Sequence, residues 1–281
     1  MPKPSFRILL KDYLHPDPDA MHLCVDAGPS HMSLSLFKKS DRQFVGYEFY
    51  PLAAASRMDD TAEILAGSPI LDIPVGNVLV TYNTPESVLI PGRLHRPEIA
   101  KQTLNIIHGD LPSGNIMQEH VQNEDIFNVY RVPGWLHEAM SARFPKGRFW
   151  HVYSAILKVI DKRKEDMPGT LLYAMFYPGH VILTLLRDGK LMIIQSFPYE
   201  IPEDVSYTLL NVTQQFGLDS EELTLWVSGL IEKDSIVYQE LLKYFMIVEP
   251  DNGNGMFRAE EVFTTYPDHY FTPAFSLCLC E

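Results

Sequence analysis

Cysteine is scarce in this sequence. The 281 residues include three cysteines, Cys24, Cys278 and Cys280. Three thiols cannot form the disulfide framework of a small secreted scaffold, so that class of protein is excluded. Cys278 and Cys280 stand two positions apart and could in principle chelate a metal, but two small apolar residues of a terminal element explain them more simply. We therefore expect a reducing environment such as the cytoplasm.

Clusters of basic residues and long apolar runs are also missing. The sequence has 36 acidic and 23 basic residues, which gives a formal net charge of −13 at pH 7. Proteins that bind nucleic acid or anionic lipid attract phosphate with clustered lysine and arginine. No apolar run approaches the roughly 18 residues of a membrane span, and residues 1–20 do not resemble a signal or transit peptide. We expect no nucleic-acid partner, no membrane insertion and a cytoplasmic location.

The composition that remains is that of a folded protein. Hydrophobic residues make up 46% of the chain and charged residues 21%, which is typical of globular domains. The most polar stretch is DKRKEDMPG at residues 161–169, and we predict a domain boundary there. The predicted division is an N-terminal arm at 1–20, a first domain at 21–165 and a second at 166–281. Residues 263–281 either complete the second domain or pack back on the first.

Residues 171–228 show the clearest pattern. Three apolar runs come first, at 171–176, 180–187 and 190–197. Asp188-Gly189 between the last two predicts a tight hairpin, because a type I′ turn needs positive φ at both central residues. A helix is predicted from Pro202, which suits a first helical turn, to Gly217, which suits a helix end. A buried strand is then predicted at 223–228.

The first half of the chain shows a similar order of elements. We predict strands at 23–26, 31–38, 44–50, 78–82, 87–90, 115–122 and 126–132, and helices at 59–65, 96–107, 133–144 and 151–163. Asp60 and Thr61 are the predicted caps of the first helix. After residue 228 we predict a helix at 235–244 and an apolar run at 245–248. Residues 22–107 and 171–248 thus both give three strands, a helix, further strand and a second helix, which predicts two related α/β domains that face each other across a cleft.

A repeated β-β-β-α-β-α order resembles the actin-like, ribonuclease H-like fold of actin, Hsp70 and the sugar kinases. In its letters, the stretch at residues 191–229 resembles the DUF3822 family of uncharacterised Bacteroidetes proteins. The same resemblance is carried by MSLSLF at 32–37, SVLIPGRL at 87–94 and HYFTPAFSLCLCE at 269–281. It implies an actin-like fold related to the cytoplasmic assembly proteins of type IV pili and type II secretion. It implies no particular activity.

ATPases of this fold carry an Asp-x-Gly turn after the first strand of each domain. In those enzymes the carboxylate orients the metal and water, and glycine and hydroxyl groups let backbone amides close on phosphate. The resemblance places the first turn at Asp26-Ala27-Gly28, with Ser30 and Ser33 as nearby hydroxyls. Pro29 removes an amide that a phosphate would use. A plain hairpin turn explains the same letters more simply.

The other two nucleotide-binding turns implied by the resemblance are altered. The second has Tyr177 where an acid is expected, followed by Pro178 and Gly179. The third, on the adenosine side, retains only Ser228 and Gly229 of a glycine pair. We therefore predict no catalytic residues and no hydrolysis. Two alternatives remain: the protein binds ATP and Mg²⁺ without hydrolysis, or it is a nucleotide-binding actin-like ATPase. In either case the candidate nucleotide-binding residues are Asp26, Gly28, Ser30, Gly179 and Gly229.

A different motif favours a rival interpretation. His108-Gly109-Asp110 followed by Asn115 resembles the H-G-D-x-x-x-x-N loop of aminoglycoside and choline phosphotransferases. That resemblance implies Asp110 as the group that accepts the substrate hydroxyl proton, and Asn115 and Asp125 as ligands of Mg²⁺. The glycine-rich loop and strand lysine of such kinases are missing from residues 1–107. A helix end followed by a polar turn explains the motif more simply.

The sequence therefore predicts a degenerate, non-hydrolysing actin-like protein that acts through contacts with a protein partner. It does not decide whether the protein is an enzyme, although the altered turns argue against it. The ten histidines form no closely spaced ligand pair, so we predict no metal site.

Overall fold

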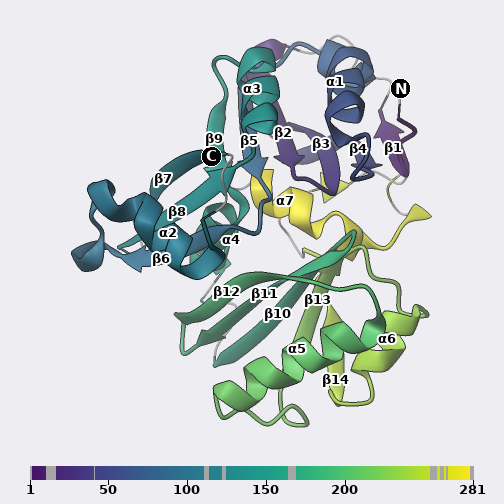
Figure 1. The fold of residues 1–281 in the computed structure, drawn as a ribbon. Helices are drawn as coiled ribbons and strands as arrows, with labels where there is room; N and C mark the ends of the chain where they lie inside the picture. Colours follow the sequence, from purple (N-terminus) through teal and green to yellow (C-terminus); the bar gives the residue numbers. More distant parts are fainter. Residues whose placement is uncertain are drawn as a thin grey trace. The chain divides into compact units, whose positions relative to one another are not determined.

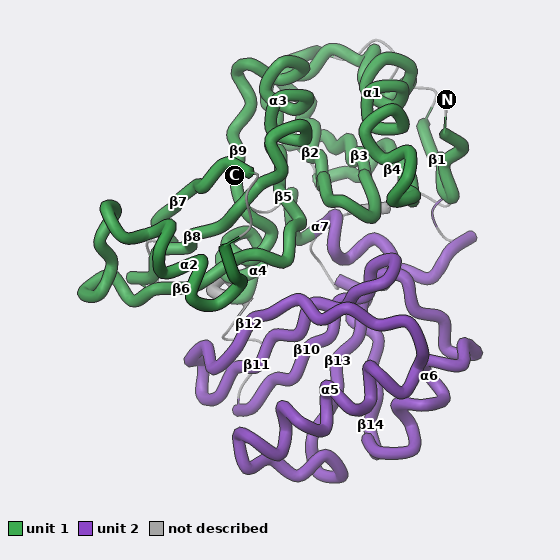
Figure 2. Tube along the Cα trace, viewed as in Figure 1, with its two compact units in different colours: residues 1–161, 257–262, 276–281 green, residues 162–256, 263–275 purple. Residues whose placement is uncertain are grey.

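The chain divides into two compact units, which Figure 2 shows in different colours. The computed structural model describes residues 2–10, 17–40, 42–110, 114–121, 125–163, 169–253, 258–259, 263 and 265–278. Unit 1 contains residues 1–161, 257–262 and 276–281, and unit 2 contains residues 162–256 and 263–275. The described residues of the predicted arm, 2–10 and 17–20, fall in unit 1.

Unit 1 is built on a mixed sheet with the order β1-β4-β3-β2-β5-β9, in which β15 also pairs with β4 (Figure 1). Strands β2, β3 and β4 form an antiparallel meander, and β5 and β9 run parallel to β2. Their bounds are β1 Phe6–Leu9, β2 Met21–Ala27, β3 His31–Lys38, β4 Gln43–Pro51, β5 Asn77–Tyr82, β9 Arg148–His151 and β15 Arg258–Ala259.

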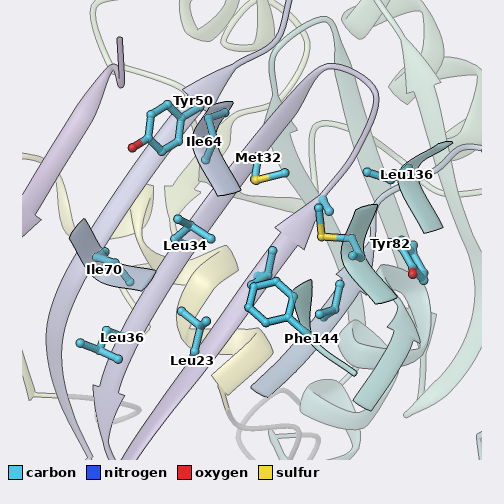
Figure 3. Packing of buried hydrophobic residues seen from close by; sticks show 14 of the residues in the cluster. Leu23, Met32, Leu34, Leu36, Tyr50, Ile64, Ile70, Tyr82, Leu136 and Phe144 are labelled. Carbon is cyan, nitrogen blue, oxygen red and sulfur yellow. The ribbon is translucent and has the colours of Figure 1, made fainter. Parts of the chain in front are cut away.

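The core of unit 1 lies between this sheet and two helices, α1 (Arg57–Gly67) and α3 (Gly134–Arg143). Figure 3 shows Leu23 and Leu34 of the sheet among the same buried side chains as Ile64 of α1 and Leu136 of α3. The helices α1 and α3 also contact each other. A further helix, α4 (Val152–Arg163), follows β9. Apolar side chains of the strands and of both helices thus meet in one core.

A small antiparallel sheet is inserted between β5 and α3. Its order is β6-β8-β7, and helix α2 packs on it. Ile90, Leu104 and Val129 belong to a separate small core there. The bounds are β6 Ser87–Pro91, α2 Ala100–His108, β7 Asn115–Val121 and β8 Ile126–Val132.

Unit 2 has a five-stranded sheet with the order β12-β11-β10-β13-β14. The turn between β11 and β12 has positive φ at Asp188 (51°) and Gly189 (72°), which confirms the predicted hairpin. The bounds are β10 Thr170–Tyr177, β11 His180–Arg187, β12 Lys190–Pro198, α5 Pro202–Gln215, β13 Thr224–Gly229, α6 Ile236–Leu241 and β14 Ile247–Pro250. Of the last helix, α7 (Thr272–Cys278), residues 272–275 belong to unit 2 and residues 276–278 to unit 1. Among the described residues, no helix is long and apolar enough to cross a membrane.

The two sheets share one topology. The order β4-β3-β2-β5-β9 of unit 1 corresponds to β12-β11-β10-β13-β14 of unit 2, with antiparallel pairs first and parallel pairs after them. This confirms the predicted duplicated α/β order. Helix α3 of unit 1, not α2, stands where α6 stands in unit 2, because α2 belongs to the insertion. The match that we drew between residues 96–107 and 235–244 was therefore wrong.

Three local predictions also differ from the structure. Residues 6–9 of the predicted arm form strand β1, which pairs with β4 through Leu9↔Gly46 and its neighbours. The predicted helix at 151–163 is preceded by an unpredicted edge strand, β9, parallel to β5. The N-cap of α1 is Ser56 and not Asp60 or Thr61. Short edge strands have too few residues to show a period, which explains the first two differences.

Candidate functional site

The Asp26-Ala27-Gly28 turn joins β2 to β3 at the end of the first strand. The Gly28 amide donates to the His31 carbonyl at 3.0 Å, which closes the hairpin. The Asn83 amide donates to the Ala27 carbonyl at 2.9 Å, so the residue after β5 is tied to the same turn. A Cβ on Gly28 would stand 2.8 Å from the Asn83 carbonyl oxygen, which explains why glycine is needed at this close approach.

The Asp26 side chain is buried, with 2% of its surface exposed. Its Oδ2 atom lies 3.1 Å from Nε2 of His31. Thr81 donates its hydroxyl to Oδ1 at 3.3 Å, and Asn83 donates its amide to Oδ2 at 3.4 Å. A buried carboxylate without partners would be costly, and here three side chains of unit 1 satisfy it. We call Asp26, His31, Thr81 and Asn83 the Asp26 network.

Aromatic rings and a second histidine surround the Asp26 network. The His31 ring stacks on Phe49, with centroids 5.5 Å apart and planes 7° apart. Burial raises the pKa of Tyr47, and the negative charge of Asp26 raises it further. Burial lowers the pKa of His151 to about 4, against weaker opposing effects of the Thr84 carbonyl and Asp26. His151 is therefore neutral at pH 7.

Backbone groups of this turn are already engaged in the fold. The Gly28 amide is used by the hairpin, and Pro29 has no amide. The Ser30 hydroxyl lies 3.4 Å from Nδ1 of His31, on the other side of the ring from Asp26. The structure thus brings Asp26, Gly28 and Ser30 together, as predicted, but holds them through contacts with the protein itself.

The second predicted turn, Tyr177-Pro178-Gly179, is aromatic. The Tyr177 ring is buried and stacks on His180, with centroids 5.0 Å apart. Its hydroxyl donates to the Met175 sulfur at 3.1 Å. The Tyr199 hydroxyl donates to the Tyr177 carbonyl at 3.1 Å. Gly179 has φ of 72°, as a tight turn needs. No carboxylate belongs to this turn in the sequence.

The third predicted turn, Ser228-Gly229, is packed against strand β10. The Tyr173 hydroxyl lies 2.8 Å from the Ser228 hydroxyl and 3.0 Å from Oδ2 of Asp251. Gly229 has φ of 78°, and a Cβ there would overlap the Phe176 carbonyl oxygen. The Leu230 amide donates to that same oxygen at 2.9 Å. This turn is therefore a close contact between two strands.

The residues of the rival phosphotransferase motif do not come together. Asp110 is exposed and accepts from the Asn105 amide at 2.9 Å. Asn115 begins β7, whereas Asp125 lies beyond the far end of that strand and pairs with His120 at 3.5 Å. The seven residues of β7 rise about 20 Å, so Asn115 and Asp125 cannot share one Mg²⁺ ion. Residues 111–113 of the motif lie outside the described residues.

Sequence reasoning missed a partly buried acid in the insertion. Glu119 of β7 accepts from the His151 amide at 2.9 Å, and the Tyr130 hydroxyl donates to it at 3.4 Å. Burial raises the pKa of Glu119 to about 7, against the opposing effects of hydrogen bonds and of Lys158. A single glutamate in an alternating strand gives no signal of such an environment. Among the described residues, no three His, Cys, Asp or Glu side chains are grouped to hold a metal.

A cavity of about 360 Å³ also opens in unit 1. It lies between the start of β2, residues 71–78 and the loop after α3, and Arg143 and Lys146 line it together with apolar side chains. None of the predicted site residues lines it.

Comparison with known proteins supports the architecture. A family model for DUF3822, described as a protein of unknown function, matches residues 16–248. A crystal structure from Bacteroides thetaiotaomicron, described as having an actin-like ATPase fold and unknown function, is similar with a TM-score of 0.73 and 16% identity. The match covers 84% of this chain and 92% of that chain. No curated protein matches.

Two further solved structures share the fold at lower identity. One is a chain of the PilM–PilN type IV pilus biogenesis complex, with a TM-score of 0.59 and 14% identity, over 94% of this chain and 98% of that one. The other is the ethanolamine utilization protein EutJ from Carboxydothermus hydrogenoformans, with a TM-score of 0.51 and 9% identity, over 97% and 94%. These matches show the fold and leave the activity to be argued from the residues.

Proposed function

The chain belongs to the DUF3822 family and has an actin-like ATPase fold, and from this premise we propose that it is a non-hydrolysing protein that works by binding another protein. The observation that carries the proposal is the Asp26 network. The turn where an ATPase of this fold keeps its metal-orienting acid is held here by His31, Thr81 and Asn83.

The physical argument concerns what a nucleotide would have to displace. Removing a partner from a buried polar group costs about 1–3 kcal/mol for each group left unsatisfied. To face a metal ion, Asp26 would have to give up its contact with His31, and the hairpin would have to release the Gly28 amide. Tyr177 supplies no carboxylate in the second turn. These losses favour a fold that no longer binds Mg²⁺ and ATP.

Exposed apolar residues on the insertion support the protein-binding half of the proposal. Ile106 and Ile107 of α2 are 81% and 63% exposed, and Leu94 is 60% exposed. Ile106 and Ile107 are neighbours on one helix, and large exposed apolar side chains that lie together are typical of protein interaction sites. The PilM–PilN structure is itself a complex of two proteins. The exposed Arg93 and Lys101 lie near these residues in the sequence, so a partner segment with apolar and acidic side chains fits best.

Thermal unfolding with Mg·ATP tests the nucleotide half. We expect the Tm of the wild-type protein to stay the same at millimolar Mg·ATP, and to stay equally unchanged with Mg·ADP. The matched control is Asp26→Asn, which keeps the size of the side chain. A rise in Tm with Mg·ATP that disappears in Asp26→Asn would overturn the proposal.

Cross-linking in the native cells tests the protein-binding half. Three tagged proteins are compared: the wild type, a double Ile106→Asp and Ile107→Asp variant, and Met58→Asp as a control on the exposed side of α1. We expect one protein to be recovered with the wild type and with Met58→Asp, and to be lost with the double variant. Recovery of the same proteins with all three would count against α2 as the contact surface.

A further inference from the structure

The cavity of about 360 Å³ in unit 1 has an apolar interior. One wall is formed by residues 71–78, which lead from the 3₁₀ helix at Pro69–Asp72 into β5, and another by the turn after α3. Leu23, Ile73 and Phe144 also line the cavity, and all three are buried members of the main core of unit 1. Figure 3 shows Leu23 and Phe144 among the side chains of that core. The packed core therefore supports the apolar lining.

The turn after α3 holds Lys146 at this cavity. Its four residues run from Phe144 to Gly147, and the Gly147 amide donates to the Phe144 carbonyl at 2.9 Å. Pro145 stands at the second position of the turn, where proline presets φ. Because the backbone is already fixed, little backbone entropy is lost at Lys146 when a ligand binds.

Arg143 joins the two walls of the cavity. Its Nη2 atom donates to the Leu71 carbonyl at 3.1 Å, and its Nε atom donates to the Leu65 carbonyl at 3.4 Å. The guanidinium carbon also lies 5.5 Å from the centroid of the Phe144 ring. These partners hold the guanidinium in place, but they carry no net charge that would neutralise it.

The charged side chains of the lining are both basic. Among the described residues that line the cavity these are Arg143 and Lys146, which are exposed and so stand at its opening. In the described part of the chain neither forms an ion pair. The Asp19 carboxylate lies beside Gly76 but does not line the cavity. The last turn of a helix favours a cation such as Arg143 by itself, whereas Lys146 lies beyond the helix. The opening thus favours an anionic group.

We propose that this cavity binds a small monocarboxylate with an apolar body of about ten carbon atoms. The carboxylate contacts Lys146 and Arg143 at the opening, and the hydrocarbon part lies against the apolar lining. An apolar cavity of about 150 Å³ accepts one benzene molecule, so a cavity of about 360 Å³ suits roughly twelve to fourteen non-hydrogen atoms. This inference does not rest on the proposed function.

The affinity is expected to be modest. For about twelve non-hydrogen atoms, ordinary ligand efficiency gives a dissociation constant of about 0.1–1 mM. The two basic side chains are exposed, so their attraction for the carboxylate is limited and is screened by salt. Removing the charge of Lys146 should therefore weaken binding by about threefold to fivefold. Replacing the carboxylate by a hydroxyl group affects both contacts and should weaken binding by about tenfold.

Titration of the full-length, nitrogen-labelled protein with phenylbutyrate tests the proposal by NMR. Phenylbutyrate combines a carboxylate with an apolar body of the expected size, and phenylbutanol is a neutral control of nearly the same shape. Gly76 and Gly147 line the cavity, so their amide signals report on it. Gly179 and Gly189 lie in hairpin turns of unit 2 and serve as internal controls.

Two lysine variants separate the cavity from general charge effects. Lys146→Met removes the positive charge at the opening and keeps the length of the side chain. Lys101→Met makes the same change of charge at an exposed position of α2. Circular dichroism verifies that both variants fold, and Lys146→Gln replaces Lys146→Met if that variant does not fold.

We expect phenylbutyrate to shift the signals of Gly76 and Gly147 saturably in the wild type and in Lys101→Met, while those of Gly179 and Gly189 stay in place. Lys146→Met should bind about threefold to fivefold more weakly, and high salt should reduce the difference. Three results would each overturn the proposal. They are the absence of a saturable shift at Gly76 and Gly147 up to about 5 mM ligand, equal binding of phenylbutanol, and equal affinity of Lys146→Met and the wild type.

Discussion

Asp26→Ala should destabilise the protein strongly. The substitution removes a carboxylate that is 2% exposed and leaves His31, Thr81 and Asn83 without one of their partners. Each buried polar group left unsatisfied costs about 1–3 kcal/mol. The Thr81 and Asn83 contacts, at 3.3 and 3.4 Å, are long, so most of the loss comes from His31. We expect a total loss of about 3–4 kcal/mol in the free energy of unfolding.

Urea unfolding followed by circular dichroism measures this loss directly. Asp26→Asn keeps the shape of the side chain and should lose about 1–2 kcal/mol. Asp59→Ala, which removes an exposed acid of α1, is the matched control and should lose less than about 1 kcal/mol. A double-mutant cycle with His31→Ala should give a coupling energy of at least about 1 kcal/mol between Asp26 and His31.

The opposite result would refute the reasoning. Acids that a site keeps for a ligand or a metal are commonly a cost to the fold, so replacing them often stabilises the protein. If Asp26→Ala unfolds at the same urea concentration as the wild type, or at a higher one, the carboxylate is not held in place by the fold. An additive double mutant would lead to the same conclusion about the contact with His31.

Two other predictions follow from single positions. Burial raises the pKa of Glu119 from 4.5 to about 7. Between these pH values the folded state holds a proton that the unfolded state has released, so the free energy of unfolding decreases as the pH rises from 4.5 to 7. Glu119→Gln should remove this pH dependence, so the variant should be more stable than the wild type by about 1–3 kcal/mol at pH 8 and equally stable near pH 4.5. Urea unfolding at several pH values measures this, and the same pH dependence of the free energy of unfolding in both proteins would contradict it. Gly229→Ala should lower the free energy of unfolding by at least about 2 kcal/mol more than Gly179→Ala does. Both glycines have positive φ, but only a Cβ at position 229 would overlap the Phe176 carbonyl oxygen. Equal losses in thermal unfolding would argue against this close contact.

Much of the fold follows from short-range patterns. The bounds of β3 and β8 agree with the strands predicted at 31–38 and 126–132, although β3 is buried on both faces and not on one. The Asp188-Gly189 turn follows from the positive φ that a type I′ turn needs. The order of elements in unit 2 could therefore be predicted from the sequence.

Edge strands and the insertion could not be predicted in the same way. Strands β1 and β9 have four residues each, which is too short for a period, and their partners lie far away in sequence. Leu104 of α2 faces the small core of the insertion and not that of the main sheet. Helical spacing shows that a helix has a buried face, but it does not show what covers that face.

The sequence identified residues of the candidate site, but it did not identify the side chains that contact them. Asp26, Gly28 and Ser30 were singled out by the resemblance to actin-like ATPases. The partners of Asp26 come from β3 and from the end of β5, and nothing in the sequence marks Thr81 or Asn83 as its neighbours. Long-range pairing of strands brings these groups together, and that pairing is only visible in the structure.

A calorimetric titration with Mg·ATP tests the central claim most directly, because the claim concerns whether the Asp26 turn serves the fold or a nucleotide. The wild-type protein is titrated with Mg·ATP up to about 1 mM, where a dissociation constant in the micromolar range would be evident. We predict no saturable heat and no release of phosphate. Saturable binding at one site per chain that Asp26→Asn abolishes would contradict the account.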